Sequence, residues 1–226
     1  MKNKVLILSV LFGAFVLFGF AVNSNLFSDL NETPGYQGSP MSPLATGDSC
    51  FGAGQELHDD RSFESGGGWN ATALDGRIAV KFRPASYPWK YNKLCLPLTK
   101  NAGADSLVYD ILIYDSTGVG GGPGVMKDSV IGVVARLIPN FAVYTWYASD
   151  ISAKNGTLVN SGCIWIAIRW NASINSAAGK FIAYDNSAAT PVWPSMYSAN
   201  GAAWANSTVA WPTYKAFGLR TMGQTP

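Results

Sequence analysis

Residues 77–98 constrain the fold more than any other stretch of the chain, because apolar and polar residues alternate there. In the first seven of these residues every second side chain is large and apolar, the pattern of a strand buried on one face. The alternation resumes over residues 94–98. Between the two runs, Pro84 and Pro88 interrupt any ladder, since proline has no backbone N–H to donate. We therefore expect two strands joined by a proline-bounded turn, forming an inner hairpin.

Short apolar runs and turn signals continue to alternate from Cys50 to the end of the sequence, which is typical of all-β domains. The further strands that we expect are residues 107–115, 130–137, 141–147, 157–159, 163–170, 180–184 and 214–220. No segment after the N-terminal apolar run has a helical period, so helix content should be low. The prediction is an all-β fold, a single antiparallel, jelly-roll-like β-sandwich over residues 50–226.

The first 24 residues predict a signal peptide or an N-terminal membrane anchor. Lys2 and Lys4 precede an uncharged apolar run over residues 5–22, and Ala21 and Ser24 offer small residues for cleavage. The run is near the lower length limit of a membrane-spanning helix. We favour cleavage, because polar residues follow the run directly. In either case the rest of the chain is exported, so we expect an extracellular or cell-surface protein that contacts a membrane only through an uncleaved segment.

Composition agrees with export and argues against some partners. Only 13% of the residues are charged, about half the usual share. The formal net charge is +2 and no basic cluster concentrates it, so we expect no nucleic-acid partner. Residues 25–49 are rich in proline, glycine and serine and predict an extended arm. The arm is either a flexible tether or a strand donated to another subunit.

The cysteines Cys50, Cys95 and Cys163 lack the close spacing of metal sites. In an oxidising compartment we expect one disulfide, and Cys50–Cys95 is the preferred pair because it would pin the incoming segment onto the second strand. Cys163 would then be a free thiol. Such a thiol is either buried as a small hydrophobe or exposed and able to link subunits.

No catalytic set is recognisable, so we expect that the protein is not an enzyme. His58 is the single histidine, and the glycine-rich loop at residues 116–124 is not followed by the residues of a phosphate-binding loop. Asp59, Asp60 and Glu64 are candidate ligands of a structural calcium ion, because carboxylate oxygens suit that cation. The alternative is a solvated acidic turn. No other cofactor is expected.

Aromatic residues crowd the last third of the chain among small and amide side chains. Trp193, Tyr197, Trp204 and Trp211 are candidates to stack on sugar rings, to anchor a subunit interface, or to fill the core. Trp89, at the proline-bounded turn, is a further candidate. Five sequons would mark surface positions in a host that glycosylates asparagine. They are Asn31, Asn70, Asn155, Asn171 and Asn206.

Several motifs together resemble a known kind of module. Their order is LHDDRSFESGGGWN, RIAVKFRPASYPWKYNKL, a strand ending in IYD before GGGPG, CIWIAIRW, and a closing aromatic strand ending in GLR. This order resembles a jelly-roll accessory module of secreted bacterial surface proteins, and the likeness covers most of residues 57–220. Its motifs are structural and include no catalytic set. The resemblance implies an accessory, binding or assembly role.

Two functions remain open. In the first, the protein is a structural or interaction protein of the cell surface that binds itself or other surface proteins and assembles into an extracellular fibre through its arm. In the second, it is a lectin-like module that binds polysaccharide through its tryptophans. The long arm and the weakly charged surface favour the first.

Overall fold

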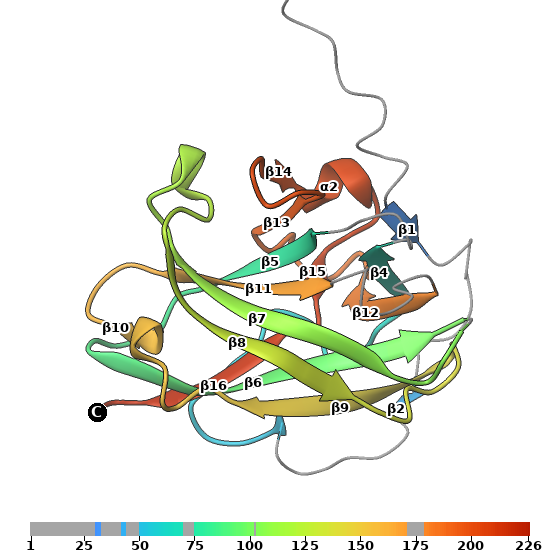
Figure 1. Ribbon diagram of the computed structural model, residues 1–226, viewed down its shortest axis with the longest axis horizontal. Coiled ribbons are helices and arrows are strands. Elements are labelled where there is room, and N and C mark those ends of the chain that lie inside the picture. The colour runs from blue at the N-terminus through green and yellow to red at the C-terminus, as the bar shows by residue number, and fades with distance from the viewer. Residues whose placement is uncertain (1–29, 33–41, 44–49, 70–74, 102, 171–178) are drawn as a thin grey trace, which may run out of the picture.

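The computed structural model describes residues 30–32, 42–43, 50–69, 75–101, 103–170 and 179–226. Two antiparallel sheets lie face to face, and within these ranges helix is limited to single turns, so the predicted all-β sandwich is confirmed (Figure 1). The turns are η3 (Val119–Gly121), η4 (Asn155–Thr157) and α2 (Ser207–Ala210). No helix in the described part of the chain is long and apolar enough to cross a bilayer. The predicted signal or anchor, residues 1–24, lies outside the described residues.

The first sheet is organised around β6, its longest strand. Its members are β1 (Leu30–Glu32), β2 (Ser42–Pro43), β3 (Gln55–Glu56), β4 (Ser65–Trp69), β6 (Trp89–Lys100), β9 (Val143–Asp150), β10 (Leu158–Val159), β12 (Lys180–Asp185), β15 (Ala216–Phe217) and β16 (Arg220–Gln224). β9 and β10 pair along one edge of β6, and β12 and β16 pair along the other. The arm contributes β1, which pairs with β4, and β2, which pairs with β9.

The second sheet has the order β14-β13-β5-β11-β7-β8. Its strands are β5 (Gly76–Phe82), β7 (Leu107–Asp115), β8 (Met126–Ala135), β11 (Ile164–Trp170), β13 (Ser195–Ser198) and β14 (Ala205–Asn206). β7 and β8 form a hairpin whose loop holds Gly120 and Gly121 at φ values of 64° and 76°, a conformation that glycine adopts without strain. β7 has the limits expected from its alternation.

The expected inner hairpin is wrong. β5 and β6 lie in different sheets, and residues 83–88 carry the chain from one sheet to the other, with a cis peptide between Tyr87 and Pro88. Both edges of β5 are taken by β11 and β13. Alternation identifies the buried face of each strand, and it does not identify the strand that pairs with it.

The core lies between the sheets and is lined by the alternating residues of both. From β5 and β11, Ile78, Val80, Ile166 and Ile168 are all fully buried there. Each sheet also carries a smaller buried cluster on its outer face. One contains Cys95, Trp146 and Phe63, and the other contains Trp165, Tyr114 and Leu112. Part of each outer face is therefore buried, which limits where a ligand can reach the molecule.

Candidate functional site

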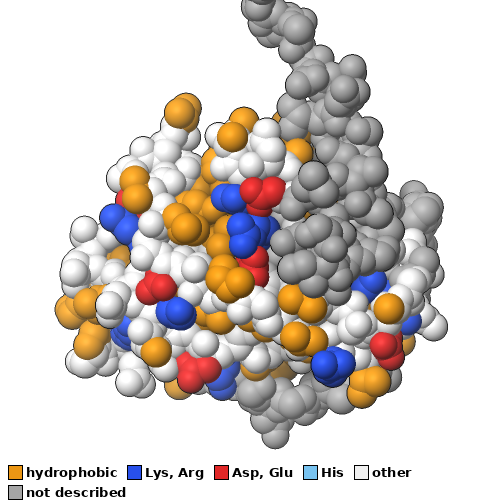
Figure 2. Space-filling view, viewed as in Figure 1, with side chains coloured by type: hydrophobic (Ala, Val, Ile, Leu, Met, Phe, Trp, Pro, Cys, Tyr) orange, Lys and Arg blue, Asp and Glu red, His pale blue; other side chains and the backbone are white. Residues whose placement is uncertain are grey.

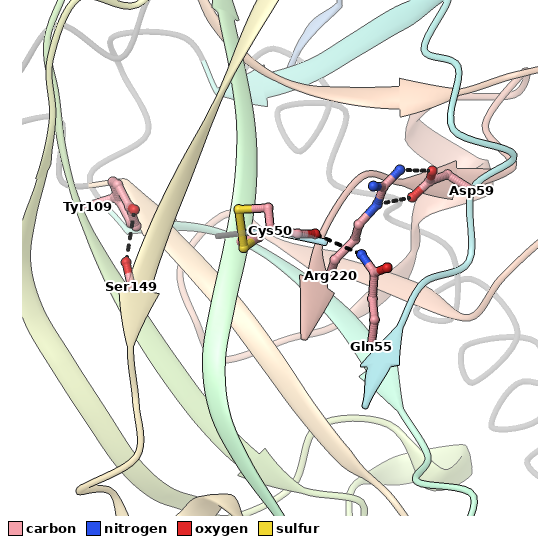
Figure 3. The surroundings of a disulfide bond; sticks show 7 residues. Cys50, Gln55, Asp59, Tyr109, Ser149 and Arg220 are labelled. Atoms are coloured by element: carbon pink, nitrogen blue, oxygen red, sulfur yellow. Dashed lines mark hydrogen bonds and ion pairs between the residues drawn. A yellow bond between two sulfur atoms is a disulfide. The ribbon is translucent and has the colours of Figure 1, made fainter. Parts of the chain in front are cut away.

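Residues 50–64 form a clamp segment across the outer face of the first sheet. Cys50 is joined to Cys95 of β6 by a disulfide, the pair that was predicted, and the Gln55 side chain donates to the Cys50 carbonyl oxygen at 2.8 Å (Figure 3). Phe63 is fully buried and meets two aromatic rings of β9 edge-on. The clamp segment therefore closes this face with a covalent bond at one end and aromatic packing at the other.

Asp59 lies in the clamp segment and pairs with Arg220 of β16, which corrects its assignment as a calcium ligand. Arg220 donates from Nη2 to Asp59 Oδ1 at 2.5 Å and from Nε to Oδ2 at 3.1 Å (Figure 3). The two side chains are 1% and 0% exposed, and the guanidinium lies 4.4 Å from the ring centroid of Trp146. Both carboxylate oxygens of Asp59 are engaged in this buried ion pair, so its role is structural.

Asp60 and Glu64 do come together, with Asp185 at the end of β12 as a third carboxylate. One oxygen of each lies within 4.8 Å of the other two. Ser62 Oγ lies within hydrogen-bond distance of a carboxylate oxygen of both Asp60 and Glu64, and the Ser187 amide donates to Asp185 at 2.7 Å. These are the hard oxygen ligands that calcium prefers. A structural calcium ion remains a prediction for this acidic cluster.

Two of the five aromatic residues expected to contact sugars are buried in the core. Trp211 is 0% and Tyr197 is 2% exposed, with their rings 5.7 Å apart, so neither offers a face to a ligand. This corrects the expectation for both. Trp193 is half-buried, and its face is covered by His58 at 3.6 Å. Trp204 is half-buried and meets a tyrosine of β7 edge-on at 5.6 Å.

Trp89, the fifth candidate, lines a pocket of about 200 Å³ at one end of the sandwich. We call this the Trp89 pocket, and the end that carries β10 and the C-terminus the β10 end (left in Figure 1). Gln55, Glu56 and Arg83 share the pocket with the half-buried ring of Trp89. An amide, a carboxylate and a guanidinium thus surround one indole.

The carboxylate of this pocket belongs to a buried polar network. Glu56 accepts a hydrogen bond from Tyr91 Oη at 2.5 Å and one from the Arg83 amide at 2.6 Å, and it lies 3.4 Å from His58 Nε2. Burial raises the pKa of Glu56, and hydrogen bonds from Tyr91 and Arg83 partly oppose this. Burial also lowers the pKa of His58 to about 3, so the imidazole is neutral at ordinary pH. Glu56 is therefore the titratable group of the pocket.

A second and larger pocket, of about 590 Å³, opens at the same end of the sandwich. We call it the Asn160 pocket; its polar lining includes Lys127, Asn155, Asn160 and Ser161. The free thiol of Cys163 also lines it and is half-buried, between the two environments considered from the sequence.

Tyr87 lies in the turn between Ala85 and Trp89, which line the Trp89 pocket, and was not among the expected site residues. Its ring is 39% exposed, and its hydroxyl donates to the Gly162 carbonyl oxygen at 2.5 Å. The prolines of the turn were the available signal, because a turn between two sheets projects its side chains at the end of a sandwich. The sequence contained no comparable signal for the Asn160 pocket, which residues 155–164 form together with Asp115 and Lys127.

The outer face of the second sheet carries several paired charges. Arg169 donates to Asp110 at 2.8 Å, and Arg77 donates to Asp75 at 2.7 Å and to Tyr114 Oη at 2.5 Å. Figure 2 shows these signs alternating down the middle of the face, with hydrophobic side chains beside them. Such mutual neutralisation leaves no concentrated charge to attract an ionic partner.

The sequons divide between described and undescribed parts of the chain. Asn155 and Asn206 are exposed, as glycosylation requires, and Asn206 also caps α2 by accepting from the Thr208 amide at 3.1 Å. Asn31 lies in β1. Asn70 and Asn171 lie outside the described residues. Glycosylation stays a prediction.

No protein-family model matches the sequence, and no curated protein matches it. The fold is similar to a crystal structure of the cysteine protease and lectin-like domains of Cwp84, a surface layer associated protein of Clostridium difficile. The TM-score is 0.51 at 11% sequence identity, and the match covers 78% of this chain and 37% of that one. The chain thus spans well under half of that structure, and the likeness concerns the fold.

Proposed function

We propose that the protein is a non-enzymatic carbohydrate-binding module of the cell surface and that the Trp89 pocket is its sugar site. The observation that carries the proposal is one half-buried indole in a pocket with an amide, a carboxylate and a guanidinium. Sugar rings are bound by aromatic faces together with a few placed hydrogen-bonding groups. The similar structure contains a lectin-like domain and belongs to a surface-layer-associated protein, which supports both the ligand class and the location.

The test is binding of the purified secreted protein to chitin, cellulose and peptidoglycan, measured by depletion from solution. Trp89→Ala and Arg83→Ala should each lower the affinity at least about tenfold, equivalent to about 1.4 kcal/mol. Arg83 is exposed, so its substitution should leave folding unchanged. Trp204→Ala is the matched control, because that tryptophan packs on the second sheet away from the pocket. Equal binding by all four proteins would refute the assignment of the site.

A second function is favoured by the position of the arm. We propose that β1 of one copy can take the place beside β4 in a neighbouring copy, which would link subunits into an extracellular fibre. In support, Leu30–Glu32 pairs only as an added edge strand, with Leu30 opposite Trp69. Electron microscopy of the secreted protein with and without residues 25–49 tests this. Fibres that persist without the arm, or their absence in both samples, would contradict it.

We also propose that the sandwich is a jelly roll. The eight main strands are, in chain order, β4, β5, β6, β7, β8, β9, β11 and β12. In the first sheet the neighbouring strands are β4, β12, β6 and β9, which are the first, eighth, third and sixth of this series. In the second sheet the neighbouring strands are β5, β11, β7 and β8, which are the second, seventh, fourth and fifth of the series. This is the arrangement of two Greek keys in a double sheet.

A further inference from the structure

We propose that the Asn160 pocket is a second subsite of the same carbohydrate site, so that the ligand is an oligosaccharide chain rather than a single sugar. The inference rests on the proposed sugar-binding role of the Trp89 pocket. It names the class of ligand that the whole β10 end would take.

The two pockets have walls on neighbouring, hydrogen-bonded strands. Val159 of β10 lines the Asn160 pocket and is the register partner of Trp89 of β6. Paired strands are about 5 Å apart, so one strand spacing separates these two walls. Tyr87 reinforces the link, because its hydroxyl is bonded to Gly162 in the loop that forms the Asn160 pocket. This hydrogen bond ties the turn that precedes Trp89 to the loop between Ser161 and Cys163, and Tyr87 is 39% exposed, so it offers a surface over which a chain can pass.

The Asn160 pocket has the chemistry of a sugar subsite. Asn160 and Ser161 are exposed, and neither side chain has a hydrogen-bond partner within the described ranges, so an amide and a hydroxyl face solvent ready to bind. Leu158 is 44% exposed at the same pocket and supplies apolar surface for the C–H face of a sugar. The charged residues Lys127 and Asp115 of this pocket pair with each other, with Lys127 Nζ 3.2 Å from Asp115. A neutral, hydroxyl-rich ligand therefore suits the pocket better than an ion.

Pocket size favours one extended ligand. The Trp89 pocket, at about 200 Å³, is smaller than the range of roughly 300–1,000 Å³ that encloses a complete small-molecule ligand. The Asn160 pocket, at about 590 Å³, lies within it. A chain that fills both gains from linkage, because the second contact is intramolecular once the first has formed.

The experiment is calorimetric titration of the full chain with cello- and chito-oligosaccharides of two to six units. Affinity should rise at least about tenfold between the disaccharide and the longer chains. Asn160→Ala combined with Ser161→Ala should remove that rise and leave the disaccharide affinity unchanged. Asn140→Ala is the control, since Asn140 is an exposed asparagine near Lys100, at the other end of β6.

A thiol readout tests the same point independently of affinity. Because Cys163 lines the Asn160 pocket, a bound hexasaccharide should slow its alkylation by N-ethylmaleimide, and a disaccharide should not. Affinity that is independent of chain length, or a rise that survives both substitutions, would overturn the second subsite while leaving the Trp89 site in place. Failure of every oligosaccharide to bind the unmodified protein would overturn the proposed function, and the second subsite with it.

Discussion

Removing Asp59 should strongly destabilise the protein, because the structure places this carboxylate in a buried ion pair. Asp59 and Arg220 are 0% and 1% exposed and share two hydrogen bonds, and the guanidinium also lies over Trp146. Asp59→Leu would leave a buried guanidinium without its counter-charge. Arg220 Nη1 already has no hydrogen-bond partner within the described ranges, so no spare acceptor stands ready.

The expected magnitude follows from the burial of both partners. Breaking such a pair by removing one side costs about 3–5 kcal/mol, whereas replacing both by apolar residues is often close to neutral. For a domain of this size, 1 kcal/mol corresponds to about 2–4 °C in Tm. Asp59→Leu should therefore lower Tm by about 6–20 °C, and the double variant with Arg220→Met should recover most of that loss.

The assay is thermal unfolding followed by circular dichroism for both single variants and the double variant. Asp150→Asn is the control, because Asp150 is exposed on β9. The Tm of this variant should equal that of the parent protein. The reasoning fails under either of two results. One is a change in Asp59→Leu no larger than in the control. The other is a double variant whose loss equals the sum of the two single losses.

Three further properties can be predicted. Reducing the Cys50–Cys95 disulfide, whose cysteines are 45 residues apart, should lower the free energy of unfolding by about 4 kcal/mol in urea titrations; a loss below about 1 kcal/mol would count against the clamp. Calcium chloride should raise Tm relative to protein in chelator, and Asp185→Asn should abolish the increase; equal melting in both buffers would rule out the calcium prediction. The pKa of His58 is lowered from 6.5 to about 3, so its stabilisation is complete above pH 6.5 and is lost as pH falls toward 3. The loss should be on the order of 4 kcal/mol. Glu56 acts in the opposite direction because its pKa is raised, so the two effects are separated by comparing the parent with His58→Phe at each pH, where an unchanged slope would contradict the assignment.

The fold was predictable where the information is local. Period-2 alternation located β7 and β11, and in β11 the isoleucines lie in the core while Trp165 lies on the opposite face. Pairing was not predictable in the same way, because alternation fixes the face of a strand and leaves its neighbour open. The preferred disulfide was correct because it depended only on one segment entering beside one strand.

The candidate sites were predictable only in part, because their members are far apart in the chain. Asp59 was grouped with its sequence neighbours, whereas its partner Arg220 lies 161 residues away. Asp185 joins Asp60 across 125 residues, so no spacing motif could include it. The crowding of aromatic residues indicated bulk and not exposure, and Trp211 accordingly lies in the core.

The proposed placement of the binding site at one end of the sandwich rests on how the chain packs on both sheet faces. The clamp segment covers the outer face of the first sheet and buries Phe63 there. On the second sheet, Trp165 is only 3% exposed, and its indole N–H donates to Gly121 of the glycine loop at 3.0 Å. Aromatic rings on the outer faces of the sheets thus contact the clamp segment and the glycine loop instead of a ligand. The β10 end carries side chains with unused hydrogen-bonding capacity, such as Asn160, and the exposed ring of Tyr87. A ligand should therefore bind across the strand ends rather than along the sheets.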